Sequence, residues 1–222
     1  MKLIYVADPM CSWCYGFSKE MAELMEMNPE ISLEIVVGGL SAGSNKVLDD
    51  ADKRFRLMHW SKVEAISGLP FNREALMARE GFVYDSGPAC RALVTAIKMN
   101  TGISILKIFR AIQHGFYVDG KDVTSPSELV KILSNTFALE GYPVNDDLIL
   151  TMFNSEEIKL ETENHFKTVK HTFGISSFPA LLLEDHGEIK TISAGYMAAN
   201  MLQEIMNKIS NQNDSVLCQK HS

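Results

Sequence analysis

Short apolar segments lie near both ends of the chain, and the middle shows helical spacing instead. Near the N-terminus, Leu3–Val6 is a short apolar run, and Leu33–Val37 is a second one that ends at two glycines. Between them, residues 14–27 carry apolar side chains three or four positions apart, as on one face of a helix. A strand, a helix and a second strand within residues 1–40 predict a βαβ unit with parallel strands.

The segment from about residue 45 to 173 has almost no strand pattern and predicts consecutive helices. Ser125 is a candidate N-cap, since Pro126 follows at the first helical position and Glu128 stands where a capping box needs it. Another helix is expected to begin after Ser155 and to end at Gly174. Two further helices are predicted over residues 88–99 and 103–116.

The last part of the chain returns to a strand pattern. Residues 180–184 form an apolar run that ends at an Asp-His-Gly turn, and residues 188–192 then alternate, which predicts a hairpin. A closing amphipathic helix is expected over residues 197–209, and the polar segment 211–222 is predicted to be a disordered tail.

This order of elements predicts an α/β fold with a mixed four-stranded sheet and a large inserted helical domain. The sheet domain is discontinuous, because residues 1–44 and 174–210 supply it together. The insertion covers residues 45–173.

Composition narrows the possible functions. The chain has 222 residues, of which 46% are hydrophobic, so it can bury a sizeable core. Its 28 acidic and 21 basic residues give a net charge of −7, which argues against a nucleic-acid partner. No apolar run approaches a membrane span, and the apolar start is too short for a signal peptide. We therefore expect a cytoplasmic protein without a membrane partner.

Two of the four cysteines form a Cys-x-x-Cys motif, Cys11-Ser12-Trp13-Cys14, between the first strand and the first helix. At a helix start, free backbone N–H groups and the helix dipole stabilise a thiolate, so Cys11 is expected to have a lowered pKa. The thiolate is the reactive form, and Cys11 is therefore the predicted nucleophile. Cys14 is predicted to resolve the mixed disulfide that Cys11 forms.

A zinc site is the main structural alternative for such a motif. It would need a second pair of ligands at suitable spacing, and Cys90 and Cys218 are isolated in the sequence. A purely structural disulfide is unfavourable in a reducing compartment. We therefore expect no metal and no bound cofactor apart from a redox-active Cys11–Cys14 disulfide.

Several segments resemble the DsbA-like thioredoxin family, especially its FrnE-like branch of cytoplasmic proteins similar to protein-disulfide isomerases. The similarity spans about residues 1–210. Its specific parts are the segments 8–17 and 174–181, and weaker similarity lies at residues 37–40 and 84–92. The resemblance implies a thioredoxin-like fold and a thiol-disulfide oxidoreductase acting on protein or peptide thiols and disulfides. Glutathione is an expected electron partner.

The resemblance also implies further site residues. Pro179 would be the family's cis-proline, and the backbone of Phe178 would bind an extended substrate strand beside the cysteines. Ser12 and Trp13 would contact substrate, and Trp13 and Phe17 are expected to form an exposed aromatic rim. Ser12 and Trp13 bring no cation to the thiolate, and the acidic Asp8 stands three residues before Cys11, which predicts a less oxidising couple than that of DsbA and favours a reductase or isomerase.

Two other functions stay open at this point, and the oligomeric state is not predicted. A glutathione-dependent transferase or isomerase resembling the kappa class would carry Ser in place of Cys11. A non-catalytic module would bind peptides without turnover. Other candidate residues are interpreted as structural: Cys90 as a buried small side chain, and His59 and His114 as histidines with structural partners.

Overall fold

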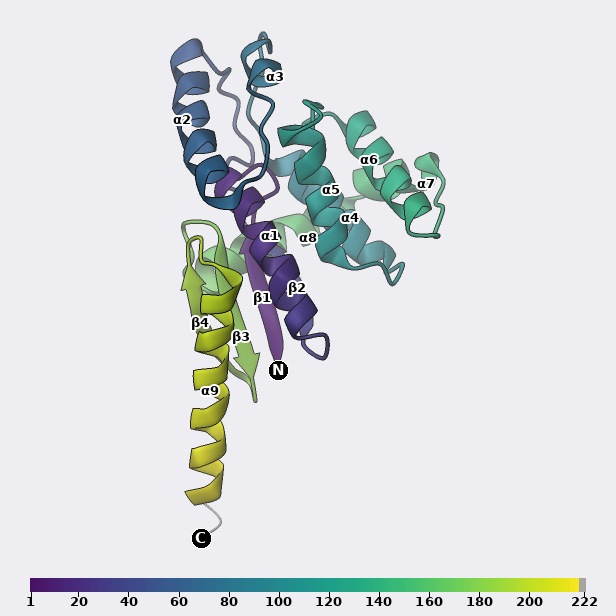
Figure 1. Ribbon diagram of the computed structural model, residues 1–222. Coiled ribbons are helices and arrows are strands. Elements are labelled where there is room, and N and C mark those ends of the chain that lie inside the picture. Colours follow the sequence, from purple (N-terminus) through teal and green to yellow (C-terminus); the bar gives the residue numbers. More distant parts are fainter. Residues whose placement is uncertain (220–222) are drawn as a thin grey trace.

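The computed structural model describes the backbone of residues 1–219 and the side chains of residues 1–209. Its centre is a mixed four-stranded sheet in the order β2-β1-β3-β4 (Figure 1). As predicted, β1 and β2 are parallel, and β3 and β4 form an antiparallel hairpin. The strands are β1 (Lys2–Ala7), β2 (Ser32–Val37), β3 (Ala180–Asp185) and β4 (Glu188–Ala194).

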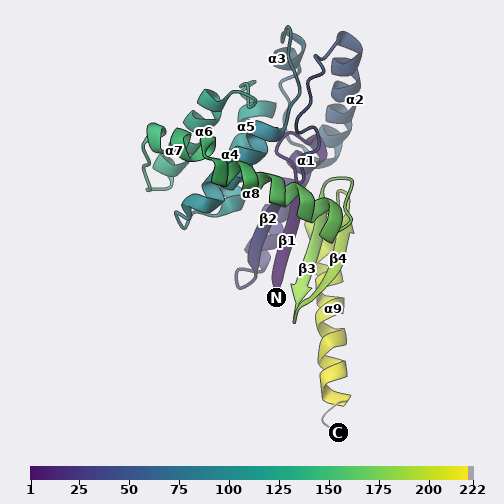
Figure 2. The ribbon, with the colours of Figure 1, turned by 180° about the vertical axis from the view of Figure 1, so that it is seen from behind.

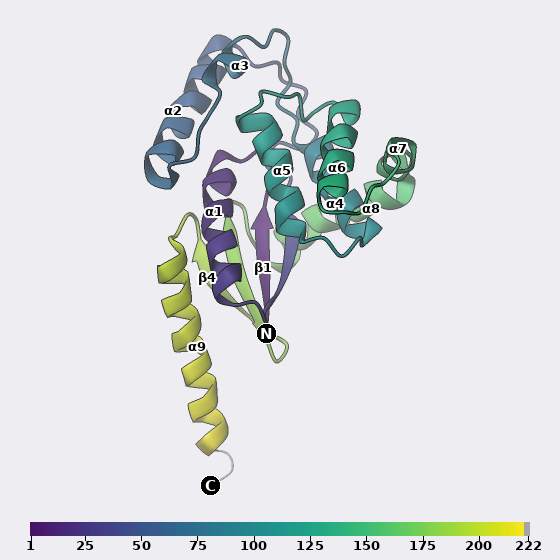
Figure 3. The same ribbon diagram turned by 45° about the vertical axis from the view of Figure 1, so that its right-hand side comes forward.

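Side chains alternate along β1 between two buried layers, which explains why this strand lies in the middle of the sheet. Leu3, Tyr5 and Ala7 belong to the large core on the side of α1 (Ser12–Met27). Ile4 and Val6 belong to a smaller cluster on the opposite face. Figure 2 shows α8 crossing that opposite face, and Figure 3 shows α1 and α9 on the first one.

Helices fill the segment between β2 and β3, as predicted. Their buried side chains join the core that covers one face of the sheet, so a single continuous apolar cluster connects the two parts. The proposed domain boundaries remain a prediction. The helices are α2 (Asp50–Ser67), α3 (Arg73–Met77), α4 (Gly87–Met99), α5 (Ile105–Tyr117), α6 (Pro126–Leu139), α7 (Asp146–Asn154) and α8 (Glu156–Lys167), followed by the π-helical turn η1 (Thr168–Thr172).

The two predicted helix starts differ in their outcome. Ser155 caps α8, because its hydroxyl accepts a hydrogen bond from the N–H of Ile158 at 3.3 Å. The capping box expected at Ser125 is not formed. The Ser125 hydroxyl lies 3.0 Å from the Ser127 hydroxyl, and Glu128 forms an ion pair with Lys131.

The closing helix α9 (Ala199–Gln219) is longer than the sequence analysis predicts. It continues through residues 211–219, which were assigned to a disordered tail, and no Gly or Pro interrupts it. Residues 220–222 lie outside the described residues. Among the described helices, none combines the length and apolarity that a membrane span requires.

Helix α2 lies close to the start of α1, and a glycine makes this possible. A Cβ at Gly16 would lie only 2.6 Å from the side chain of Val63, so a larger residue would push the two helices apart. The hydroxyl of Tyr15 donates to the carbonyl oxygen of Pro70 at 3.2 Å and so connects α1 to the segment after α2. These contacts place one face of α2 beside the Cys-x-x-Cys motif.

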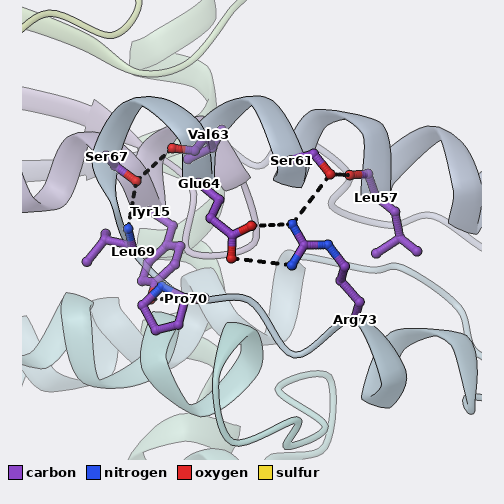
Figure 4. A network of polar contacts seen from close by, with 9 residues as sticks. All are labelled: Tyr15, Leu57, Ser61, Val63, Glu64, Ser67, Leu69, Pro70 and Arg73. Carbon is purple, nitrogen blue, oxygen red and sulfur yellow. Dashed lines mark hydrogen bonds and ion pairs between the residues drawn. The ribbon is translucent and has the colours of Figure 1, made fainter.

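A network of polar contacts ties the segment after α2 back onto that helix (Figure 4). The guanidinium of Arg73 donates to both carboxylate oxygens of Glu64, at 2.5 and 3.3 Å, and this pairing lowers the pKa of Glu64. The hydroxyl of Ser67 donates to the carbonyl of Val63 and accepts from the N–H of Leu69. The ion pair is partly open to solvent and contributes little alone, whereas the Ser67–Val63 hydrogen bond is buried; together they fix the direction in which the chain leaves α2.

Candidate active site

Cys11 occupies the N-cap position of α1, immediately before the first helical residue. Its N–H donates to the carbonyl of Asp8 and its carbonyl accepts from the N–H of Tyr15, both at 3.0 Å. The side chain makes no capping hydrogen bond, so the sulfur is not used to stabilise the helix. The helix start at which the sequence analysis placed Cys11 is therefore present.

Cys14 lies in the first turn of α1, and the two thiols differ in accessibility. Cys14 is 0% exposed and Cys11 is 5% exposed. Burial is the main cause that raises the pKa of the Cys14 thiol well above its usual value, and the neighbouring Cys11 raises it further. Both cysteines are free thiols. Of the two residues, only Cys11 has any surface open to solvent.

The segment before β3 faces Cys11. The Phe178–Pro179 peptide bond is cis, which confirms that expectation of the sequence analysis. The Cys11 thiol lies 3.8 Å from the carbonyl oxygen of Phe178, to which it donates a long hydrogen bond. The carbonyl of Pro179 accepts from the N–H of Gly195 at 2.8 Å. The fold thus brings the cysteine motif and the proline segment together.

The side chain of Phe178 packs against a glycine at the end of β2. A Cβ built on Gly38 would lie 2.1 Å from Cζ of the Phe178 ring, a distance that no side chain can tolerate. The ring also packs against the apolar cluster on the α8 face of the sheet. Gly38 therefore leaves space for the ring of Phe178, the residue whose backbone carbonyl faces Cys11.

Trp13 separates two hollows at the motif. One, of about 190 Å³, lies between Cys11 and α2, and the other, of about 410 Å³, lies beside Pro179. Trp13 is half-buried, and its indole N–H donates to Nδ1 of His59 at 3.4 Å. The expected exposed position of Phe17 is wrong. Phe17 is fully buried, because the rings of Tyr5 and Tyr196 pack against it edge-on.

Asp8, which the sequence places three residues before Cys11, has a buried hydrogen-bonding role that the sequence did not indicate. Its carboxylate is fully buried and accepts from the backbone N–H of Met10 at 2.8 Å and of Leu40 at 2.7 Å. The Cys90 thiol, itself buried as the sequence analysis expected, lies 3.5 Å from it. Desolvation raises the pKa of Asp8, and hydrogen bonds from Ser86 and the two backbone N–H groups oppose this rise. Asp8 thus joins the motif to the segment after β2 and to α4.

Helix α2 contributes residues to the site, among them Arg56, which no sequence pattern indicated. Arg56 and His59 line the hollow beside Cys11 together with Tyr84, whose hydroxyl donates to the carbonyl of Met10. His59 was interpreted as a structural histidine, and it does have a partner in Trp13. His114 lies elsewhere, 3.4 Å from Asp119.

Other features of the described residues do not connect to the motif. A larger hollow of about 620 Å³ lies between β2, α8 and the turn after α4, and no cysteine lines it. Within the described part of the chain, no group of three or more His, Cys, Asp or Glu side chains is arranged to bind a metal ion.

Comparison with known proteins places this geometry in a family. No protein-family model and no curated protein sequence matches the chain. Among solved structures, a candidate protein disulfide isomerase from Nitrosomonas europaea is 32% identical, with 95% of this chain and 98% of that chain covered and a TM-score of 0.82. Cytosolic disulfide reductase DsbM from Pseudomonas aeruginosa is 19% identical, with coverage of 95% and 99% and a TM-score of 0.75, and it has also been solved with GSH.

More distant structures share the fold alone. A 2-hydroxychromene-2-carboxylate isomerase is 11% identical, with coverage of 97% and 99% and a TM-score of 0.66. The FrnE-like branch stays a prediction. The sheet, the motif at the start of α1 and the 32% identity over nearly the whole length agree, and the chain belongs to the DsbA-like thioredoxin family of thiol-disulfide oxidoreductases.

Proposed function

We propose that the chain is a cytoplasmic reductase or isomerase of protein and peptide disulfides, in which Cys11 attacks the substrate and Cys14 resolves the mixed disulfide. The observation that carries this proposal is the unequal burial of the pair beside the Phe178 carbonyl. Cys11, at 5% exposure and 3.8 Å from that carbonyl, is the reachable sulfur. Cys14 is enclosed behind it.

The proposed reaction is two successive thiol-disulfide exchanges. The Cys11 thiolate forms a bond to one sulfur of the substrate disulfide, whose S–S bond breaks and releases the other sulfur as a thiolate. Cys14 then loses its proton and bonds to Cys11, which releases the second substrate sulfur. Two electrons pass to the substrate, and the enzyme is left with a Cys11–Cys14 disulfide.

The hollow beside Pro179 is the proposed site for the substrate chain. Ile66, Tyr196 and Trp13 give it apolar walls, and the backbone of Phe178 lies at its edge next to Cys11. Backbone groups beside the reacting sulfur can form β-type hydrogen bonds to an extended peptide of any sequence. Such binding suits an enzyme that acts on many disulfides.

Glutathione is the proposed electron partner. DsbM, which shares this fold, has been solved with GSH. A glutathione-dependent transferase or isomerase is not favoured as an alternative. The chain carries both cysteines, and the isomerase of this fold shares only 11% identity with it. A peptide-binding module without turnover would not need two thiols of unequal burial at a helix start.

The redox potential of the Cys11–Cys14 couple tests the proposed direction of electron flow. No cation lies between the two cysteines, and a buried carboxylate lies three residues before Cys11. We therefore expect a potential below about −150 mV at equilibrium with glutathione, compared with about −120 mV for the strong oxidant DsbA. A measured potential above that limit would mean that the protein is an oxidant of substrate thiols rather than a reductase or isomerase.

A further inference from the structure

The hollow of about 190 Å³ between Cys11 and α2 is separate from the proposed peptide site. Cys11 and Ser12 lie on one side, and Arg56 and His59 from α2 lie on the other. Met10, Trp13, Leu40, Phe55, Trp60 and Tyr84 complete its lining. Two side chains that can carry positive charge therefore share a hollow with the reachable sulfur, and no carboxylate lines it.

Arg56 forms no ion pair in the described part of the chain, although its charge contributes, after the larger effect of Lys46, to the lowered pKa of Asp52. Its guanidinium lies over the ring of Tyr84, 3.5 Å from the ring centroid, and its Nε is buried without a hydrogen bond. Asp52, one helical turn earlier, forms its ion pair with Lys46 at 2.7 Å. A guanidinium offers five N–H donors in a planar fork, and here none of them is used by a carboxylate.

Arg56 is a cation without an ion pair among the described residues, in a chain whose net charge is negative. The net charge is −7, and another basic side chain of α2 is already engaged. Lys53 is buried and donates to the carbonyls of Met77 and Arg79. An anion that approaches Cys11 would therefore meet Arg56 as an available donor.

We infer that Arg56 binds a carboxylate of glutathione in this hollow and so brings the glutathione thiol to Cys11. The inference rests on the proposed function and names the site of its electron partner. The volume is too small for a whole tripeptide and fits one carboxylate-bearing arm, with the rest of the molecule lying outside. Trp13 and Trp60 supply apolar walls for that arm.

The reaction at this site regenerates the reduced enzyme. A glutathione thiolate attacks the sulfur of Cys11 in the Cys11–Cys14 disulfide, the S–S bond breaks, and Cys14 leaves as a thiolate that takes up a proton. A second glutathione thiolate attacks the glutathione sulfur of this mixed disulfide and releases Cys11. Two glutathione molecules become one glutathione disulfide, and two electrons reach the enzyme.

The test compares thiols that differ in charge. The oxidised protein is mixed with reduced glutathione, with its diethyl ester, which lacks both free carboxylates, or with dithiothreitol, which is neutral. Tryptophan fluorescence follows reduction, because both tryptophans line the hollow. In the wild type we expect glutathione to react at least about tenfold faster than the ester. Arg56→Gln should slow glutathione by about tenfold to a hundredfold and leave the rate with dithiothreitol unchanged.

Two variants serve as controls. Arg54→Gln removes the same charge from an exposed position on the same helix and should leave all three rates unchanged. Arg56→Lys keeps the charge but not the planar fork of donors, and it should lose part of the preference for glutathione over the ester. Equal losses with glutathione and dithiothreitol in Arg56→Gln, or a wild type that reacts equally with the ester, would overturn the inference.

Further arms separate this inference from its alternatives. A cysteine peptide is tested as the free acid and as the amide. If Arg56→Gln lowers the rate only with the acidic peptide and not with glutathione, the carboxylate belongs to peptide substrates and the inference is wrong. If glutathione does not reduce the oxidised protein but the dithiothreitol-reduced protein still reduces insulin, the inference is wrong and the proposed function stands. If reduced protein cannot reduce insulin either, the proposed function itself fails.

Discussion

Replacing Cys11 with Ser is expected to lower the rate of insulin-disulfide reduction by about a thousandfold or more. The serine hydroxyl is hardly ionised near neutral pH, so it cannot replace the thiolate as nucleophile. Cys14 cannot take over, because its sulfur is fully buried and burial holds its pKa high. The substitution changes the side-chain volume little, so the fold should be kept.

Cys90→Ser is the matched control for this experiment. Like Cys11, Cys90 lies at the start of a helix, but it is fully buried and lies against Asp8 rather than against the proline segment. Insulin reduction should persist in this variant. Activity that survives in Cys11→Ser, or that disappears equally in both variants, would contradict the assignment of the nucleophile.

The second large effect is expected at Gly38. In Gly38→Ala, the new methyl group would meet the Phe178 ring at 2.1 Å, so the ring and its backbone must move. We expect the free energy of unfolding to fall by about 1–3 kcal/mol, as for other overpacked sites. Insulin reduction should slow as well, because the Phe178 carbonyl that faces Cys11 is displaced with the ring.

A double variant identifies the cause. Phe178→Ala removes the ring and keeps the backbone carbonyl, so in the Gly38→Ala/Phe178→Ala protein the clash no longer exists. The loss of stability in the double variant should be smaller than the sum of the two single losses, as measured by denaturant unfolding. If the two losses of stability are additive, the loss caused by Gly38→Ala does not arise from contact with the Phe178 ring.

The sheet could be predicted from the sequence because its pattern is local. Three strands are short apolar runs, the fourth alternates between polar and apolar residues, and Gly or Asp stands at the end of each; the helix between the first two strands fixes them as parallel. The N-cap of α8 was predicted for the same reason. The capping box predicted at Ser125 does not form, because Lys131, one turn later, forms an ion pair with Glu128. The short sequence motif does not include this competing partner.

The candidate site was predicted only in part. Cys11 and Cys14 follow from their spacing, and the cis peptide bond before Pro179 followed from family resemblance. Arg56, and the contacts of Asp8 with Leu40 and Cys90, could not be found in this way. Their positions beside the motif depend on packing between segments that are far apart in sequence, such as the close approach of α2 to α1 at Gly16. For Phe17 the sequence predicted an exposed site residue that is in fact buried. Its spacing from Trp13 gave no sign that Tyr196 packs against it.

Trapping of a substrate by the Cys14→Ala protein tests the central claim most directly. Without the resolving thiol, Cys11 should capture a peptide disulfide and keep half of it, because no second sulfur is placed to release it. Mass spectrometry of protease fragments is expected to find the adduct on Cys11, and Cys11→Ser/Cys14→Ala should give none. An adduct on Cys90 or Cys218 instead, or no adduct at all with a disulfide that the wild type reduces, would contradict the account.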